Sequence, residues 1–174
     1  MAVAALGTVL LLAGCAREAP AAPLPSGSAG AAPPAGPSGG PTGPGDAVLA
    51  AYLGYWDAVV HAHRGANPAD PVLARHAAGA ELTRVRGAVA RNRQQQISIR
   101  GTVTHQPRVA SVSGATAEVD DCYDISRWNP VSLRTGRAIK ASQQSGTGRY
   151  RGQFGLREGT GGWIVVSSSI SGAC

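Results

Sequence analysis

Two histidines separated by one residue, His61 and His63, are the first side chains in the sequence that suggest metal chemistry. They lie in a segment whose apolar residues recur at helical spacing, where positions i and i+2 stand about 200° apart around the axis. The two imidazoles therefore point to opposite sides of the predicted helix and do not share an ion. His63 falls on the apolar side, so we expect a buried, hydrogen-bonded histidine there. We predict no metal site and no cofactor.

A carboxylate on an apolar strand face is the second candidate. In segment 116–126 the odd positions Ala117, Val119, Tyr123 and Ile125 are apolar, and Asp121 shares their face. A buried carboxylate needs a partner, or its pKa rises. His63, an arginine or a tyrosine hydroxyl would serve. We expect a structural ion pair or hydrogen bond and keep a catalytic acid as the alternative. His63, Asp121 and Tyr123 together form the candidate pocket.

The third candidate is the basic side chains. Fifteen arginines and one lysine give the chain a formal charge of +6, which permits anionic partners. In the predicted strand 148–157, Arg149, Arg151 and Arg157 share one face and would meet the acids of a neighbouring strand, Glu118, Asp120 and Asp124. Arg134, Arg137 and Lys140 form a modest cluster in a predicted loop. Without interleaved aromatic residues, nucleic acid is not an expected partner.

The three cysteines have different predicted roles: Cys15 lies near the N-terminus, and Cys122 and Cys174 form a candidate pair. Residues 2–14 form an uncharged, mostly apolar run, too short to span a bilayer as a helix but suited to a signal peptide. The run closes on Leu12-Ala13-Gly14-Cys15, which resembles the bacterial lipobox; that resemblance implies lipidation of Cys15 and a signal peptide over residues 1–14. No basic residue follows Met1, so we expect the true start to lie upstream. An oxidising compartment then favours a disulfide between Cys122 and Cys174.

A tether and a folded domain are expected to follow the signal peptide. Residues 16–45 hold eight prolines and seven glycines, so they cannot repay their ordering entropy by burial, and we predict a disordered tether over 15–45. The foldable part, 46–174, opens at Asp46, a good N-cap. Seven residues at helical spacing define the apolar face of a first helix that ends near Gly65: Val48, Leu49, Tyr52, Leu53, Trp56, Val59 and Val60.

Two further helices and four strands complete the predicted domain. Asp70-Pro71 opens a short helix, and a third runs over about 80–95 with Leu82, Val85 and Val89 inward. Period-two patterns then predict a strand over 97–112 with a bulge near Pro107, followed by strands 116–126, 148–157 and 162–171. Residues 127–147 are expected to form a polar loop. Helices followed by an antiparallel meander make an α+β fold.

This element order resembles the NTF2-like fold, a curved four-stranded antiparallel sheet packed on three N-terminal helices to form a cone. It is similar to the NTF2-like domains of actinobacterial envelope lipoproteins. The resemblance implies a pocket between helices and sheet, but no particular chemistry. It also implies a homodimer as one option, since such sheets often pair.

The sequence is compatible with three hypotheses about the function of this protein. The first is a non-catalytic interaction or accessory module, lipid-anchored on the extracytoplasmic face of the cell membrane, with an envelope protein or an anionic wall polymer as partner. The second is a cone that binds a small apolar molecule. The third is an isomerase or cyclase that uses Asp121 and His63 as acid and base. A filled interior would favour the first reading, and an open pocket the second or third.

Overall fold

The computed structural model describes residues 43–139 and 148–174. The chain divides into two units, Met1–Ser38 and Gly39–Cys174, and every described residue belongs to the second. The predicted signal peptide, Cys15, Lys140 and all but the last residues of the predicted tether lie outside the described residues. Within the described part of the chain, no helix is both long and apolar enough to cross a bilayer.

The first helix, α1, spans Pro44–Gly65 and begins two residues before the predicted start. Gly43 is the N-cap, and Pro44 occupies the first helical position, where its missing N–H costs nothing and its fixed φ suits the helix. Asp46, predicted as the cap, lies instead in the first turn, where its charge complements the helix dipole. The helix ends at Gly65 as predicted, with Ala66 in the left-handed conformation.

The buried face of α1 is turned relative to the prediction. Tyr55, Ala58 and Ala62 are buried, whereas Leu53, predicted to face inward, is 41% exposed. The shift arises because α1 packs against α2 and β6 as well as against the inner face of the large sheet. Those neighbours cover a side of the helix that a search for large apolar residues does not detect.

Two shorter helices complete the helical layer. The Asp70 carboxylate accepts a hydrogen bond from the Val72 N–H at 2.9 Å and holds a turn, so α2 begins only at Leu73 and spans Leu73–His76. Helix α3 spans Gly79–Gln94. Its inward residues Val85 and Val89 are buried, as predicted, and Leu82 is partly buried against the core.

The segment predicted as one strand over 97–112 forms two strands. Strand β1 spans Ile97–Gly101 and β2 spans Pro107–Ser113, and they belong to different sheets. The partner of β1 is β4, Trp128–Ser132, inside the segment predicted as a polar loop; that prediction is wrong for these residues. A two-stranded ribbon accepts the proline of β4 because both its strands are edges.

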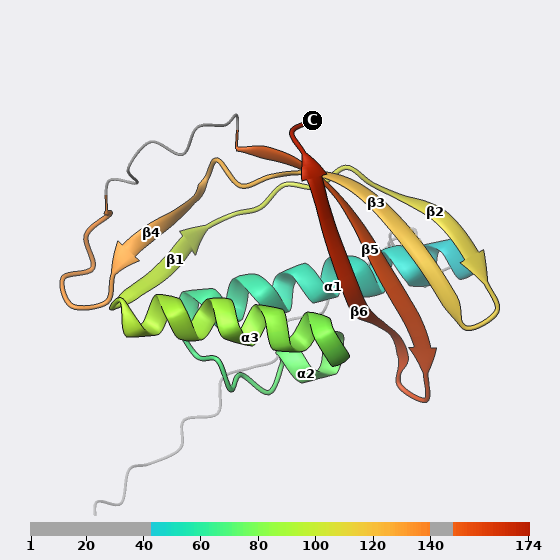
Figure 1. Ribbon diagram of the computed structural model, residues 1–174, viewed down its shortest axis with the longest axis horizontal. Helices are drawn as coiled ribbons and strands as arrows, with labels where there is room; N and C mark the ends of the chain where they lie inside the picture. The colour runs from blue at the N-terminus through green and yellow to red at the C-terminus, as the bar shows by residue number, and fades with distance from the viewer. Residues whose placement is uncertain (1–42, 140–147) are drawn as a thin grey trace, which may run out of the picture. The chain divides into compact units, whose positions relative to one another are not determined.

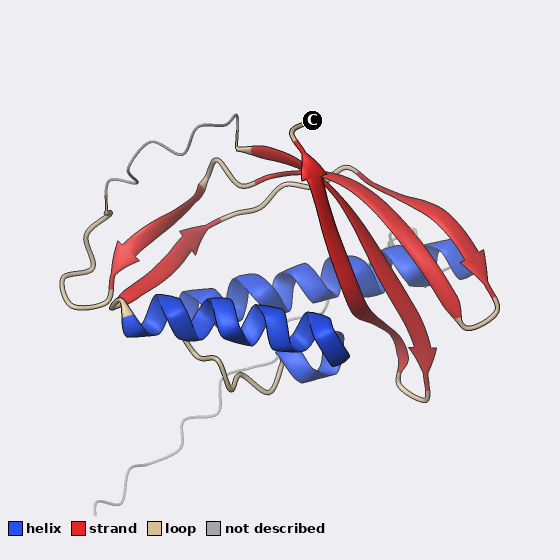
Figure 2. Cartoon of the chain, viewed as in Figure 1, coloured by secondary structure: helices blue, strands red, loops and turns tan. Residues whose placement is uncertain are grey.

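The large sheet is antiparallel with the order β2-β3-β5-β6. Strand β3 spans Thr116–Asp124, β5 spans Arg149–Gly159 and β6 spans Gly162–Gly172. The sheet arches over α1 and α3, with the β1–β4 ribbon beside it (Figure 1), and the helices lie on one side of the strands (Figure 2). The predicted α+β class, with three helices packed on a curved four-stranded antiparallel sheet, is confirmed.

One covalent bond closes the end of the large sheet. Cys122 of β3 and Cys174 at the C-terminus lie 2.08 Å apart between sulfur atoms, a disulfide that matches the predicted pair. Cys174 follows β6, so the bond joins the strand that carries Asp121 to the edge of the sheet.

Candidate functional site

A pocket of about 210 Å³ lies between α1, α3 and the inner face of the sheet. Its wall is mostly aromatic and aliphatic, and the non-aromatic polar side chains and the imidazole in it are His63, Arg84 and Ser168. The lining residues are Trp56, Val59, His63, Arg84, Val85, Ala88, Tyr123, Ile125, Trp128, Phe154, Ser168 and Ile170. An engineered apolar cavity of about 150 Å³ is large enough to bind benzene, so a pocket of this size admits a small molecule.

His63 contributes a neutral imidazole to this pocket. It is 6% exposed, and burial followed by repulsion from Arg84 lowers its pKa to about 4. The Asn92 side-chain N–H donates to His63 Nδ1 at 3.1 Å. The remaining proton of the neutral ring is therefore on Nε2. The ring also lies edge-on to Trp128, with 4.9 Å between centroids.

A buried carboxylate lies next to the pocket. Glu81 is 1% exposed and accepts hydrogen bonds from Tyr55, from Arg84 Nε at 3.0 Å and Nη2 at 2.6 Å, and from Ser168 at 2.7 Å. Burial alone would raise the pKa of Glu81, but these donors, Arg84 first, hold it below its usual value. Glu81 thus stays ionised and fixes the guanidinium from one side.

Arg84 keeps one end of its guanidinium unused. Its side chain is half exposed, and Glu81 engages Nε and Nη2. Within residues 43–139 and 148–174, Nη1 makes no hydrogen bond, and the same holds for Nε2 of His63. Trp128 adds a buried indole N–H for which no described atom is an acceptor. The wall of the pocket therefore offers donors without partners.

Asp121 lies on the predicted face but outside this pocket. It is 2% exposed and accepts hydrogen bonds from Tyr52 at 2.7 Å, from His105 Nδ1 at 2.7 Å and from the Gln106 backbone N–H at 2.7 Å. Trp56 in turn donates to the Tyr52 hydroxyl at 2.7 Å. We call Tyr52, Trp56, His105, Gln106 and Asp121 the Asp121 network.

The structure divides the predicted pocket residues between two places. His63 and Tyr123 line the pocket, and burial raises the pKa of Tyr123 to about 12. Asp121 pairs with Tyr52, one of the residue types expected, and with His105, which the pattern of the sequence did not predict. His63 is bonded to Asn92 and not to Asp121, so the acid and base expected to act together are held apart.

Neither His105 nor Glu81 had a usable signal in the sequence. His105 lies between β1 and β2, in a segment that the period-two pattern assigned to a continuous strand. Glu81 sits on α3 among polar residues, and only the tertiary contacts of Tyr55 and Ser168 bring it into the core. The described residues hold no group of three or more His, Cys, Asp or Glu side chains that could hold a metal ion.

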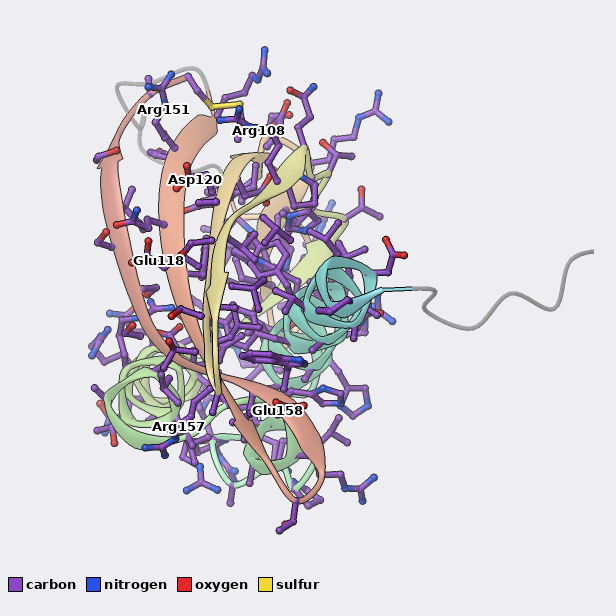
Figure 3. All side chains as sticks on the ribbon, turned by 90° about the vertical axis from the view of Figure 1, so that its right-hand side faces the viewer. Arg108, Glu118, Asp120, Arg151, Arg157 and Glu158 are labelled. Atoms are coloured by element: carbon purple, nitrogen blue, oxygen red, sulfur yellow. A yellow bond between two sulfur atoms is a disulfide. The ribbon has the colours of Figure 1, made fainter. Side chains whose placement is uncertain are left out.

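The outer face of the sheet carries charges of both signs. Figure 3 labels Arg108, Glu118, Asp120 and Arg151 on this face. Three of them, Arg108, Asp120 and Arg151, line a hollow of about 720 Å³. Of the three expected cross-strand pairs, only Arg149 lies opposite an acid, Asp124; Arg151 faces Cys122 and Arg157 faces Thr116. The two latter pairings were predicted wrongly because the strand register was not known from the sequence.

No family model matches the chain, and no curated protein matches it. Among solved structures it is similar to an NTF2-like protein from Cytophaga hutchinsonii, at 9% identity over 71% of this chain and 97% of that one, with a TM-score of 0.42. It is also similar to a candidate aromatic ring hydroxylase from Novosphingobium aromaticivorans, at 16% identity over 72% and 88%, with a TM-score of 0.48.

A third similar structure is the intermembrane space region of the chloroplast protein ARC6, at 13% identity over 71% of this chain and 93% of that one, with a TM-score of 0.42. An NTF2-like protein is thus among the similar solved structures. Similarities this distant carry no functional information, so function must be argued from the site.

Proposed function

We propose that the domain is a non-catalytic binding module that takes a small, mainly apolar molecule into the pocket between α1, α3 and the sheet. The observation that carries this proposal is the pocket of about 210 Å³ with its largely aromatic and aliphatic wall. Ligand sites are usually concave and mostly apolar, with a few placed polar groups. The sequence alone favoured an interaction module, and an open pocket favours the ligand-binding reading instead.

The distribution of acids and bases supports a non-catalytic role. General acid–base chemistry needs a group that titrates near neutral pH within reach of the substrate. In this pocket His63 has a pKa of about 4, and the carboxylate bonded to its wall, Glu81, is occupied by Tyr55, Arg84 and Ser168. The pair predicted for an isomerase or cyclase, Asp121 and His63, belongs to two separate sets of contacts.

The module is proposed to act on the extracytoplasmic face of a bacterial cell membrane. The lipobox-like Leu12-Ala13-Gly14-Cys15 and the proline-rich segment 15–45 support a lipid anchor and a tether. The disulfide between Cys122 and Cys174 supports an oxidising compartment. Replacing Cys15 with Ala should abolish incorporation of labelled palmitate, and retained label in that variant would contradict the anchor.

The binding proposal is tested by titrating the full chain carrying Cys15→Ser with toluene. We expect shifts of the indole N–H resonances of Trp56 and Trp128, which line the pocket, and little change at Trp163, which does not. Ala88→Leu should fill the pocket and weaken binding at least tenfold. Ala90→Leu, on the same helix but outside the lining, is the matched control. Equal toluene binding by both variants would contradict the proposal.

A further inference from the structure

The pocket wall has more hydrogen-bond donors than acceptors available to them. Arg84 Nη1, His63 Nε2 and the Trp128 indole nitrogen are donors without acceptors among the described residues. Ser168 is already committed to Glu81. Among these three donors the Trp128 N–H is buried, whereas the Arg84 side chain is half exposed. A ligand that supplies acceptor atoms is complementary to this set of donors.

The ionised side chains that line the pocket also carry only positive charge. Arg84 is the one ionised side chain among the twelve lining residues, because His63 is neutral at physiological pH. Glu81 holds Arg84 through Nε and Nη2 and so leaves the Nη1 end for a second anion. A guanidinium is well suited to carboxylates, since its planar N–H groups match the carboxylate oxygens.

The position of Arg84 fits a head group at the edge of the pocket. Its side chain is half exposed, whereas Phe154 and Val85 of the wall are buried. A ligand with one polar end can place its apolar body against the aromatic wall and keep its head beside Arg84 and His63, partly in water. This arrangement avoids the cost of fully burying a charge.

We propose, resting on the binding function above, that the ligand class is a small apolar carboxylic acid, bound as its carboxylate, whose head accepts hydrogen bonds from Arg84 and His63. The apolar body fills the pocket between Trp56, Trp128 and Phe154. No bond is made or broken in this binding.

The test compares benzoate with toluene, which has the same ring and no carboxylate, on the full Cys15→Ser chain. Hydrogen bonds from a charged donor predict that benzoate binds at least tenfold more tightly than toluene. Binding is followed by the indole N–H resonances of Trp56 and Trp128. If toluene binds as tightly as benzoate, the carboxylate class is wrong while the binding function stands. If neither ligand shifts these resonances, the binding function itself is wrong.

A substitution at His63 tests whether the tighter binding of benzoate comes from its carboxylate head group. His63→Leu keeps an apolar side chain in the wall and should weaken benzoate binding about tenfold while leaving toluene binding within about threefold. His61→Leu, on the opposite side of the same helix, is the matched control and should change neither. Equal loss of both ligands in His63→Leu would overturn the role of the head group. Arg84 is not replaced, because its loss would leave Glu81 buried without its cation.

Discussion

The Asp121 network and the pocket lined by Arg84 share one aromatic residue, Trp56, but they differ in how their polar groups are satisfied. In the network, both oxygens of Asp121 are used, by two side chains and one backbone N–H. In the pocket, Arg84 Nη1, His63 Nε2 and the Trp128 indole N–H have no acceptor among the described residues. Burial alone does not distinguish a structural polar group from a binding one, whereas the balance of donors and acceptors does.

The disulfide next to the network gives the largest expected effect. Replacing both Cys122 and Cys174 with Ala should lower the free energy of unfolding by about 4 kcal/mol on the chain-entropy model for a separation of this size. Urea unfolding of the two proteins at pH 7 measures the difference. The toluene affinity of the folded variant should stay close to that of the parent, since neither cysteine lines the pocket. A loss of toluene affinity without a loss of stability would contradict the separation between the Asp121 network and the pocket.

The second effect tests the network directly. Asp121→Asn places an amide N–H₂ among donors, so we expect a loss of about 3 kcal/mol in unfolding free energy. Asp120→Asn, the neighbouring acid on the outer face, is the matched control and should change stability by less than about 0.5 kcal/mol. A similar small change in both variants would show that the network does not stabilise the fold.

The third effect concerns pH and belongs to the pocket. The pKa of His63 is about 4 in the folded chain and about 6.5 when unfolded, so the unfolded state binds the extra proton between these values. Stability from a neutral His63 is therefore complete above about pH 6.5 and is lost as pH falls towards 4. Between pH 7.5 and 5 the loss should be about 2 kcal/mol. His63→Leu should lose correspondingly less stability over this interval.

The smallest effect concerns the carboxylate that positions Arg84. Tyr55→Phe removes one of the donors to Glu81 and should cost about 1.5 kcal/mol of unfolding free energy, the range for a hydrogen bond to a charged group. Tyr150→Phe is the matched control, because the Tyr150 hydroxyl makes no hydrogen bond within the described residues. Chemical denaturation of both variants measures the effect; equal costs would contradict the role of Tyr55.

The sequence predicted the layers of the fold better than its connections. Period-two and helical patterns located the three helices and the strands of the large sheet, because each pattern reports a face that local spacing reveals. They missed β4, where Trp128 packs against the core and Val131 is buried, within a segment of otherwise polar composition. They also merged β1 with β2, because the chain leaves one sheet for the other without a turn signal.

The sequence predicted the buried polar residues of the candidate site but not their partners, because local patterns report only local spacing. Strand parity placed Asp121 on the inner face, and helical phase placed His63 on the buried side, and both are buried. Their partners depend on contacts between distant segments: Tyr52 reaches Asp121 across 69 positions, and Ser168 reaches Glu81 across 87. No local pattern encodes such distances, so the sequence supplied the polar residues and the fold supplied their pairing.

The central claim is that the Asp121 network supports the fold while the pocket binds the ligand. The most direct measurement is the toluene affinity of Asp121→Asn, determined by the indole N–H titration at a temperature where the variant is folded. We expect an affinity within about twofold of that of the parent chain, together with a lowered melting temperature. An unchanged melting temperature with at least a tenfold loss of affinity would contradict it, because Asp121 would then serve the ligand and not the fold.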